Sequence, residues 1–168
     1  IRQWSIDGLP ALPRTGEVTS LIGNIPIRVN SMKQLTQQRW LGNDVIDAFL
    51  FNFKVELDKH YTRFSIMEEV YIAPITFYTY LRQSGYASVR RWFAKLRRQQ
   101  IKLDVLVVPA HVDGAHWVCM LVYPKQKRIV YMDPYHCSTN MVERCAALLE
   151  FVQTEYREYT DSFIVPPG

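Results

Sequence analysis

A histidine and an aspartate mark the outer ends of two neighbouring apolar runs, and this placement could bring them together for proton transfer. His116 opens the run HWVCMLVY, Asp133 closes the run RIVYMD, and the polar turn PKQK separates the two runs. If the runs pair as an antiparallel hairpin around this turn, we expect Met120 to face Ile129 and His116 to face Asp133. Facing residues point to the same side of a sheet, with Cβ atoms roughly 4.5–5.5 Å apart. A shift of one residue in this register would place the pair on opposite faces.

The chemistry open to such a pair is general-base catalysis. An aspartate fixes the tautomer of its histidine and stabilises the imidazolium that forms when the ring takes a proton from a nucleophile. A structural His–Asp hydrogen bond at the end of a sheet explains the same pattern, so geometry alone leaves both interpretations open. A metal site is a weaker alternative. His111, Asp113 and His116 lie close in sequence, but no further ligand cluster accompanies them, and we expect neither a metal nor a cofactor.

A nucleophile for this pair is not evident among the three cysteines, Cys119, Cys137 and Cys145. Their number and spacing fit neither a disulfide framework nor a zinc site. Cys119 lies on the strand that begins at His116, and its side chain is expected on the opposite face. Cys145 falls on the apolar stripe of a helix and is predicted to lie in the core. Cys137 comes soon after Asp133 and before a helix, whose N-terminus can lower a thiol pKa, so it is the one weak candidate.

The elements that would position these residues can be placed from apolar periodicity. Residues 1–24 show no clear period and are interpreted as an extended N-terminal arm, after which NIPIRV alternates like a short strand. In the next stretch apolar residues recur at helical spacing, and Asn43 or Asp44 can cap this helix by accepting a free N–H of its first turn. The members of this stripe are Val45, Ile46, Phe49, Leu50 and Phe53.

The second half of the chain contains the predicted sheet. VYIAPITFYTYLRQSGY is expected to form a short extended piece, a loop and more helix, and SVRRWFAKLRRQQ is expected to be helical. LDVLVVPA is a continuous apolar run of strand length, which predicts a buried strand directly before the hairpin. NMVERCAALLEFVQTEYREY predicts a long amphipathic helix, and DSFIVPPG begins a further strand. Helices, then mainly antiparallel strands, then a helix predict an α+β fold. The apolar stripe of the long helix comprises Val142, Cys145, Leu148, Leu149 and Val152.

Length and composition fit a single globular domain. The chain has 168 residues, of which 48% are hydrophobic and 21% charged, and it contains no apolar run of membrane-spanning length and no visible signal peptide. We therefore expect a monomer in a reducing intracellular compartment, nuclear or cytoplasmic, without a membrane partner. The chain starts at Ile1 and ends at VPPG, which we interpret as a piece of a longer protein.

The net charge of +4 is concentrated in RRWFAKLRRQQIK, residues 90–102. A nucleic-acid surface would need a broad basic face with stacking aromatic rings. An amphipathic segment explains the same sequence, with Trp92, Phe93 and Leu96 inward and the cations in solvent. We favour this second interpretation and do not expect a nucleic-acid partner.

Three of these segments together resemble the Ulp/SENP family of SUMO-specific cysteine proteases, including Ulp-like domains of mobile elements. NIPIRVNSMKQLTQQRWLGNDVIDAFL resembles the family's opening strand and its W-L-N-D-E-V-I-N segment. VRRWFAKLRRQQIKLDVLVVPAHVDGAHWVCMLV resembles the block containing V-P-x-H and H-W, and KQKRIVYMDPYHC resembles the K-x-I-x-Y-Y-D-S strand. The resemblance implies a papain-like (adenain/Ulp-type) α+β fold, in which helices flank a central, mainly antiparallel sheet. It places the protease domain at residues 25–168.

The resemblance also implies roles for individual residues. His116 is the general base, and Asp133 orients it. Trp40 and Trp117 correspond to two indoles that cover the extended diglycine tail of the substrate, although core packing also explains a tryptophan at either position. Glycine has no side chain, so flat aromatic walls admit Gly-Gly and exclude bulkier residues. Asn43 stands where the family usually has an aspartate that helps to hold SUMO.

The chain departs from the family pattern at three places. Gly42 and Asn43 replace the usual Asn and Asp, and Pro134 and Tyr135 replace small residues after the strand-end aspartate. In the family the nucleophile lies in a D-C-G segment well after that aspartate, with an oxyanion-hole glutamine shortly before it. VPPG ends about where the family has I-P-Q-Q, ahead of D-C-G. We therefore expect this chain to lack the nucleophile segment and to be inactive by itself.

The implied function is that of a cysteine isopeptidase domain. Such a domain cleaves after the diglycine C-terminus of SUMO or a related ubiquitin-like protein, or of its conjugates. The alternative is a non-catalytic domain, derived from such a protease, that binds ubiquitin-like proteins or serves as a scaffold. A weaker third hypothesis is a mobile-element protein whose protease-like domain serves a nucleic-acid complex. The basic segment at residues 90–102 is the observation that suggests it.

Overall fold

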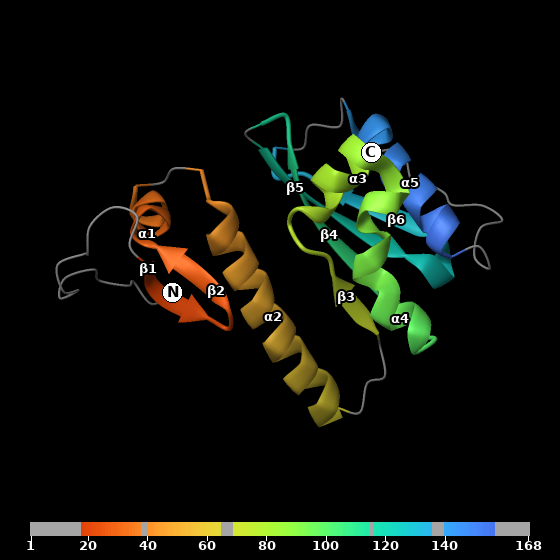
Figure 1. Ribbon diagram of the computed structural model, residues 1–168, viewed down its shortest axis with the longest axis horizontal. Coiled ribbons are helices and arrows are strands. Elements are labelled where there is room, and N and C mark those ends of the chain that lie inside the picture. The colour runs from red at the N-terminus through yellow and green to blue at the C-terminus, as the bar shows by residue number, and fades with distance from the viewer. Residues whose placement is uncertain (1–17, 38–39, 65–68, 115, 136–139, 157–168) are drawn as a thin grey trace. The chain divides into compact units, whose positions relative to one another are not determined.

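A computed structural model describes five stretches of the chain, residues 18–37, 40–64, 69–114, 116–135 and 140–156 (Figure 1). The chain divides into two compact units, residues 1–55 and 56–168. Helix α2 (Asn43–Phe64) runs from the first unit into the second. Most of the predicted N-terminal arm lies outside the described residues. None of the described helices combines the length and the apolar composition that a membrane crossing needs.

The first unit contains a short hairpin followed by a helix. Strand β1 (Val18–Ile22) pairs antiparallel with β2 (Ile25–Arg28), and helix α1 (Val29–Thr36) follows directly. At the turn between the strands Gly23 has a φ of +60°, and a Cβ atom there would lie 2.7 Å from Cζ of Phe51. The predicted strand NIPIRV is therefore present as β2, and the turn of this hairpin lies against α2.

Asp44 connects the hairpin and α1 to the start of α2. Its carboxylate accepts a hydrogen bond from the Ser31 hydroxyl at 2.5 Å and from the backbone N–H groups of Arg28 and Val45 at 3.3 and 3.0 Å. The first turn of a helix leaves N–H groups without partners inside the helix, and a carboxylate there can satisfy one of them. The predicted start of this helix is confirmed, and one side chain fixes the approach of three elements.

The second unit is built on a four-stranded sheet with the order β3-β4-β5-β6 (Figure 1). β3 pairs parallel with β4, whereas the β4–β5 and β5–β6 pairs are antiparallel. Alternate residues of β5 are buried, so one face of the sheet is covered. The predicted α+β fold with a mainly antiparallel sheet is confirmed. The strands are β3 (Val70–Ile72), β4 (Val105–Val112), β5 (His116–Tyr123) and β6 (Arg128–Met132).

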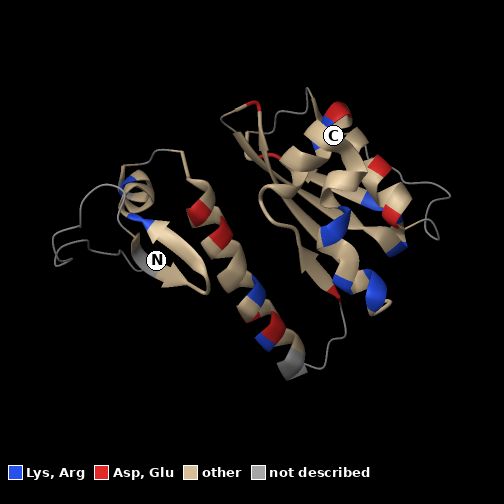
Figure 2. Ribbon diagram, viewed as in Figure 1, with Lys and Arg blue, Asp and Glu red and all other residues tan. Residues whose placement is uncertain are grey.

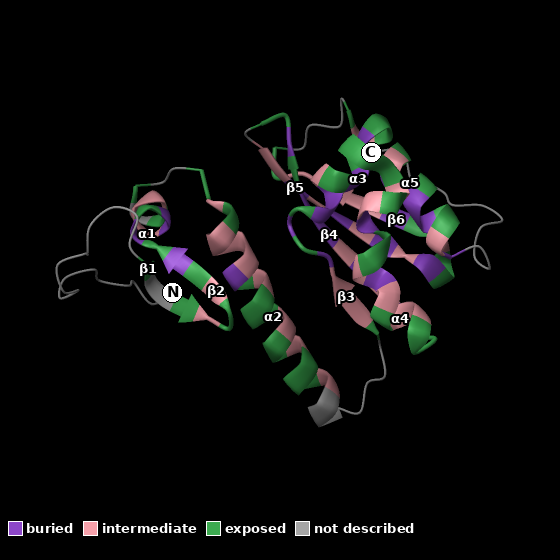
Figure 3. Cartoon of the chain, viewed as in Figure 1, coloured by how far each residue is buried: buried purple, intermediate pink, exposed green. Residues whose placement is uncertain are grey.

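Helices cover the buried face of this sheet, and Figure 3 shows buried residues on both the strands and the helices. Three phenylalanines form the centre of the core, with ring centroids 4.9–5.6 Å apart, and they come from three different elements. They are Phe77, Phe93 and Phe151. The helices are α3 (Phe77–Val89), the 3-10 turn η1 (Arg90–Phe93), α4 (Ala94–Arg98) and α5 (Met141–Glu155).

The basic segment around α4 has the amphipathic arrangement that we favoured. Phe93 is fully buried, and Trp92 and Leu96 pack against the core. The cations lie mostly on the outside, and Figure 2 shows Lys and Arg gathered on α4. Burial of the apolar side chains therefore explains the apolar spacing of this stretch.

The register of the β5–β6 hairpin differs from our prediction by two residues. Met120 faces Tyr131 rather than Ile129. The predicted pairs centre the turn between residues 124 and 125, whereas pairing up to Tyr123 and Arg128 centres it between residues 125 and 126, with a 3-10 turn at Pro124–Gln126. Because side chains alternate with a period of two, a shift of two keeps each one on its predicted face. The predicted His–Asp pair therefore shares a face, but as diagonal rather than directly opposed neighbours.

The buried face of α5 also differs from our prediction. Val142 is 72% exposed, so its assignment to the apolar stripe is wrong. Arg144 is 3% exposed and occupies the buried face instead. A charged residue is tolerated there because polar partners meet it inside the fold. The correctly predicted, fully buried members of the stripe are Cys145, Leu148 and Val152.

Candidate active site

His116 and Asp133 form a direct hydrogen bond at one end of the β5–β6 hairpin. His116 is the first residue of β5, and Asp133 directly follows β6. Nε2 of the imidazole lies 2.8 Å from Oδ1 of the carboxylate, and the two side chains are 16% and 4% exposed. The predicted proximity is confirmed. The imidazole retains some access to solvent, whereas the carboxylate has almost none.

The surroundings of Asp133 keep its carboxylate ionised. Burial alone would raise the pKa of Asp133, but a hydrogen bond from the Tyr135 N–H, a hydrogen bond from His116 and the charge of Arg144 outweigh burial and hold this pKa below its ordinary value. An ionised carboxylate only accepts hydrogen bonds. Nε2 of His116 therefore carries the shared proton, and Nδ1 is the ring nitrogen left to accept another.

Tyr135 contacts both members of the pair. Its backbone N–H donates to Oδ1 of Asp133 at 2.8 Å. Its ring centroid lies 5.0 Å from that of His116, with an interplanar angle of 32°. From the sequence we interpreted Tyr135 only as a departure from the family pattern. The observed register would have identified the contact, because continuing it beyond β6 places residue 135 opposite residue 116.

Two further side chains face the second carboxylate oxygen, Oδ2 of Asp133. The Tyr131 hydroxyl donates to it at 3.5 Å. Nη1 of Arg144 forms an ion pair with it at 3.9 Å. Sequence reasoning missed both residues. The one signal for Arg144 was a charged residue beside the apolar positions of an amphipathic helix.

Neither described cysteine is placed to supply a thiolate to His116. The side chain of Cys119 points away from the buried face of the sheet, since its neighbours Val118 and Met120 are the buried ones. Cys145 is fully buried in α5. Burial raises the pKa of both thiols, whereas a nucleophilic cysteine needs a lowered pKa. Cys137, the weak candidate, lies outside the described residues.

The residues considered for a metal have other partners. The ring of His111 lies 4.8 Å from the ring of Trp117, and Asp113 is paired with Arg144. Within the stretches that the structure describes, no three His, Cys, Asp or Glu side chains are grouped so that they could hold a metal ion.

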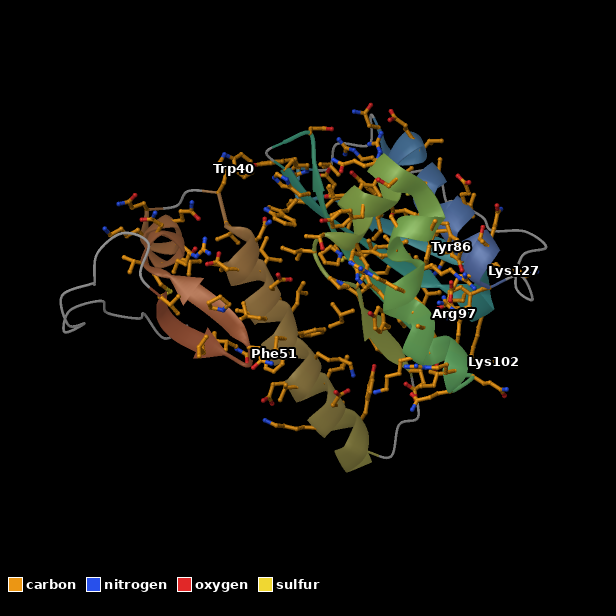
Figure 4. The ribbon with its side chains drawn as sticks, in the orientation of Figure 1. Trp40, Phe51, Tyr86, Arg97, Lys102 and Lys127 are labelled. Carbon is orange, nitrogen blue, oxygen red and sulfur yellow. The ribbon has the colours of Figure 1, made fainter. Side chains whose placement is uncertain are left out.

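The proposed substrate-binding residues lie on separate elements. Trp117 is the second residue of β5 and is partly exposed. Trp40 lies shortly before α2 and is 56% exposed, which argues against a place in the core (Figure 4). Asn43 begins α2 and lines a pocket of the first unit together with Arg28 and Asp47. The roles of these three residues toward a substrate stay predictions.

Comparison with known proteins shows the family to which this chain belongs. Residues 39–164 match the profile described as "Ulp1 protease family, C-terminal catalytic domain". Ubiquitin-like-specific protease 1 of Saccharomyces cerevisiae is 33% identical over 110 residues, which cover 66% of this chain and 16% of that protein. Sentrin-specific protease 2 of Homo sapiens is 24% identical over 146 residues, which cover 87% of this chain and 23% of that protein.

Solved structures agree with the sequence matches. The SUMO protease Ulp1 with its catalytic cysteine oxidised to a sulfinic acid has a TM-score of 0.64 and 25% identity, covering 87% of this chain and 64% of its own. The C-terminal Ulp1 protease domain in complex with Smt3, the yeast ortholog of SUMO, has a TM-score of 0.62 and 25% identity, covering 89% and 65%. The chain thus spans about a sixth to a quarter of these two curated relatives and about two thirds of the solved domains. Since the family profile matches most of its length, the chain belongs to the Ulp1 protease family.

Proposed function

We propose that this chain supplies the general base and its orienting carboxylate to a cysteine isopeptidase that acts on SUMO or a related ubiquitin-like protein. The observation that carries the proposal is the 2.8 Å hydrogen bond from His116 Nε2 to Asp133, in a chain of the Ulp1 protease family. This bond leaves Nδ1 of the imidazole as the proton acceptor. A structural pair would not require an imidazole that retains access to solvent.

The proposed reaction uses His116 both in forming and in hydrolysing a thioester intermediate. Nδ1 takes the proton of a cysteine thiol, and the thiolate attacks the carbonyl carbon of the substrate's terminal glycine. Asp133 stabilises the imidazolium that results. The imidazolium then donates its proton to the leaving lysine amine, and the glycyl thioester remains on the enzyme. Water, deprotonated by the same imidazole, hydrolyses the thioester and restores the free thiol.

The nucleophile in this proposal is neither Cys119 nor Cys145. Both thiols are held protonated by burial, and the side chain of Cys119 points away from the buried face of the sheet. We further propose that the 168-residue chain alone does not hydrolyse substrate. Cys137 is the one cysteine in the chain for which this needs a direct test, and the variant Cys137→Ala provides it.

The proposed substrate contacts follow from the shape of a diglycine tail. Trp40 and Trp117 would each present a flat wall to it, because glycine residues leave no side chain to collide with an indole. Asn43 would contact the body of the ubiquitin-like protein as a neutral residue. One similar solved domain is in complex with Smt3, the yeast ortholog of SUMO, and this supports a ubiquitin-like protein as the substrate class.

The test is steady-state cleavage by the full-length gene product of SUMO fused through its terminal glycine to a fluorogenic amine. His116→Ala should lower kcat/KM by about 10²–10⁴-fold, the usual contribution of a general base. The matched control is His60→Ala, which removes an exposed histidine of α2 and should leave kcat/KM unchanged. Equal activity of the wild type and His116→Ala would overturn the proposal.

A second function would be favoured by one specific outcome. If the full-length gene product binds SUMO but forms no cysteine-dependent product, the chain is a binding or scaffold domain derived from a protease. The placement of both described cysteines away from His116 is the observation that keeps this candidate open.

A further inference from the structure

We infer that Arg144 is a positioning residue for the His116–Asp133 pair, because its guanidinium joins the turn before β5 to the end of β6. The inference about structure stands on contacts within the second unit. Its consequence for catalysis rests on the proposed function.

The two ends of the guanidinium contact different elements. Nη1 donates to the Tyr131 hydroxyl on β6 and forms the 3.9 Å ion pair with Asp133 Oδ2. Nη2 donates to the carboxylate of Asp113, which lies in the turn between β4 and β5. His116 begins β5 directly after that turn. One side chain of α5 therefore holds both strand ends from which the candidate catalytic groups extend.

The burial of Arg144 makes this arrangement costly unless its partners are present. The side chain is 4% exposed, and Nε has no hydrogen-bond partner among the described residues. A buried charge without partners is strongly destabilising. The backbone is also held, since the Tyr78 hydroxyl donates to the carbonyl oxygen of Arg144 at 2.8 Å. α5 therefore presents the guanidinium from a fixed point in the core.

Arginine suits this position better than lysine. A guanidinium carries several N–H donors in a rigid plane, whereas an ammonium is a single point charge on a flexible stem. Here the two terminal nitrogens donate in two directions at once. A lysine in place of Arg144 would keep the positive charge but could not bridge the turn and β6 with the same geometry.

The bridge also fixes how the Asp133 carboxylate is turned. Its Oδ1 accepts from His116 and from the Tyr135 N–H, and its Oδ2 faces Tyr131 and Arg144. Among the described residues, the charged and titratable side chains that contact the pair are Tyr131, Tyr135 and Arg144, with Asp113 beyond Arg144. With Oδ2 held from one side, Oδ1 points at Nε2 and the imidazole keeps Nδ1 as its acceptor.

The experiment uses the 168-residue chain and needs neither a nucleophile nor a substrate. NMR of ¹⁵N-labelled histidine reports which nitrogen of His116 carries the proton, and ¹³C carboxyl shifts follow the titration of Asp133. In Arg144→Met the Asp133 titration midpoint should rise, and the Nε2–H tautomer should lose its dominance. Arg144→Lys should largely keep the midpoint but lose the tautomer preference, because charge remains and the bridge is gone. If Arg144→Met fails to fold, the Arg144→Lys variant alone provides the test.

The matched control is Arg97→Met. Arg97 lies on α4, and its ion pair with Glu155 is at the opposite end of α5 from Arg144. Arg97 Nη1 contacts the buried carboxylate of Glu155 at 2.6 Å (Figure 4). This variant should lose stability without moving the midpoint or the tautomer. If Arg144→Lys and every folded Arg144 variant keep the wild-type tautomer and midpoint, the inference is overturned.

The consequence for catalysis is measured separately, as kcat and KM of the full-length gene product. Arg144→Lys should lower kcat by about 10–100-fold, the range known for losing the partner behind a metal-bound histidine, and should leave KM nearly unchanged. An unchanged kcat would overturn the catalytic part of the inference. If the wild-type product is itself inactive, the proposed function fails, while the NMR result still decides whether Arg144 positions the pair.

Discussion

Replacing Asp133 by asparagine tests the electrostatic account of the site with a minimal change of shape. Oδ1 accepts from Nε2 of His116 and from the Tyr135 N–H, each at 2.8 Å. Oδ2 faces the Tyr131 hydroxyl at 3.5 Å and Nη1 of Arg144 at 3.9 Å. An asparagine amide has one oxygen and one NH₂ group. If the NH₂ group takes the place of Oδ1, it faces the Nε2–H of His116 and the Tyr135 N–H. If it takes the place of Oδ2, it faces the guanidinium of Arg144.

The magnitude follows from these contacts. A hydrogen bond to a charged group contributes about 1.5–3 kcal/mol, and at least one is lost in either orientation of the amide. Arg144, itself 3% exposed, also loses its nearby anion. We therefore expect Asp133→Asn to lower the free energy of unfolding at pH 7 by about 2–4 kcal/mol.

The loss should depend on pH in one direction. The pKa of Asp133 in the folded state lies below its ordinary value, so ionisation stabilises the fold fully at pH values above about 4. This contribution disappears as the pH falls through the folded-state pKa. The difference between the wild type and Asp133→Asn should therefore be large at pH 7 and shrink below about pH 4.

Urea unfolding followed by circular dichroism from pH 7 to pH 3 measures this difference. The matched control is Asp58→Asn, the same chemical change at an exposed position of α2, for which we expect a change within about 0.5 kcal/mol. A loss for Asp133→Asn that is as small as the control, or that is equal at both ends of the pH range, would refute the electrostatic account.

Two further predictions concern thiols and turns. Iodoacetamide at pH 7 should modify neither Cys119 nor Cys145 in the folded chain, because burial raises the pKa of both thiols; rapid alkylation of either, detected by mass spectrometry, would contradict their assignment as structural. Gly23→Ala should lower the free energy of unfolding more than Gly114→Ala. Both glycines have a positive φ, which costs other residues about 1–2 kcal/mol, but only at Gly23 would the new Cβ meet an atom within 4 Å, Cζ of Phe51 at 2.7 Å. Equal losses in urea unfolding would show that the contact with the ring is unimportant.

Much of the fold could be predicted because burial leaves a periodic trace in the sequence. LDVLVVPA and HWVCMLVY became the buried strands β4 and β5, since one face of the sheet is covered along its length. The register of the hairpin could not be fixed in the same way. It depends on where the turn is centred, and the four residues of PKQK, the first three of them in a 3-10 turn, centre it one residue later than the predicted pairs do.

The His116–Asp133 pair could be predicted because both residues lie at strand ends. A register shift of two residues leaves both side chains on the same face of the sheet. The rest of the site could not be predicted. Tyr135 contacts the pair through a loop backbone N–H and a ring, and only the correct hairpin register, which places residue 135 opposite residue 116, would have indicated it. The burial of Arg144 could not be predicted, because this residue occupies a core position of the helical period but carries a charge. Only the tertiary partners Tyr131 and Asp113 explain its burial.

We propose that His116, held by Asp133, activates a cysteine toward the diglycine end of a ubiquitin-like protein. The most direct measurement is the rate at which the full-length gene product forms a covalent adduct with SUMO that carries an electrophile at its C-terminus. Mass spectrometry of the product identifies the modified cysteine. We predict an adduct on a cysteine other than Cys119 or Cys145, formed at least about 100-fold more slowly in His116→Ala. Equal rates in the wild type and His116→Ala, or no adduct in the wild type, would contradict the claim.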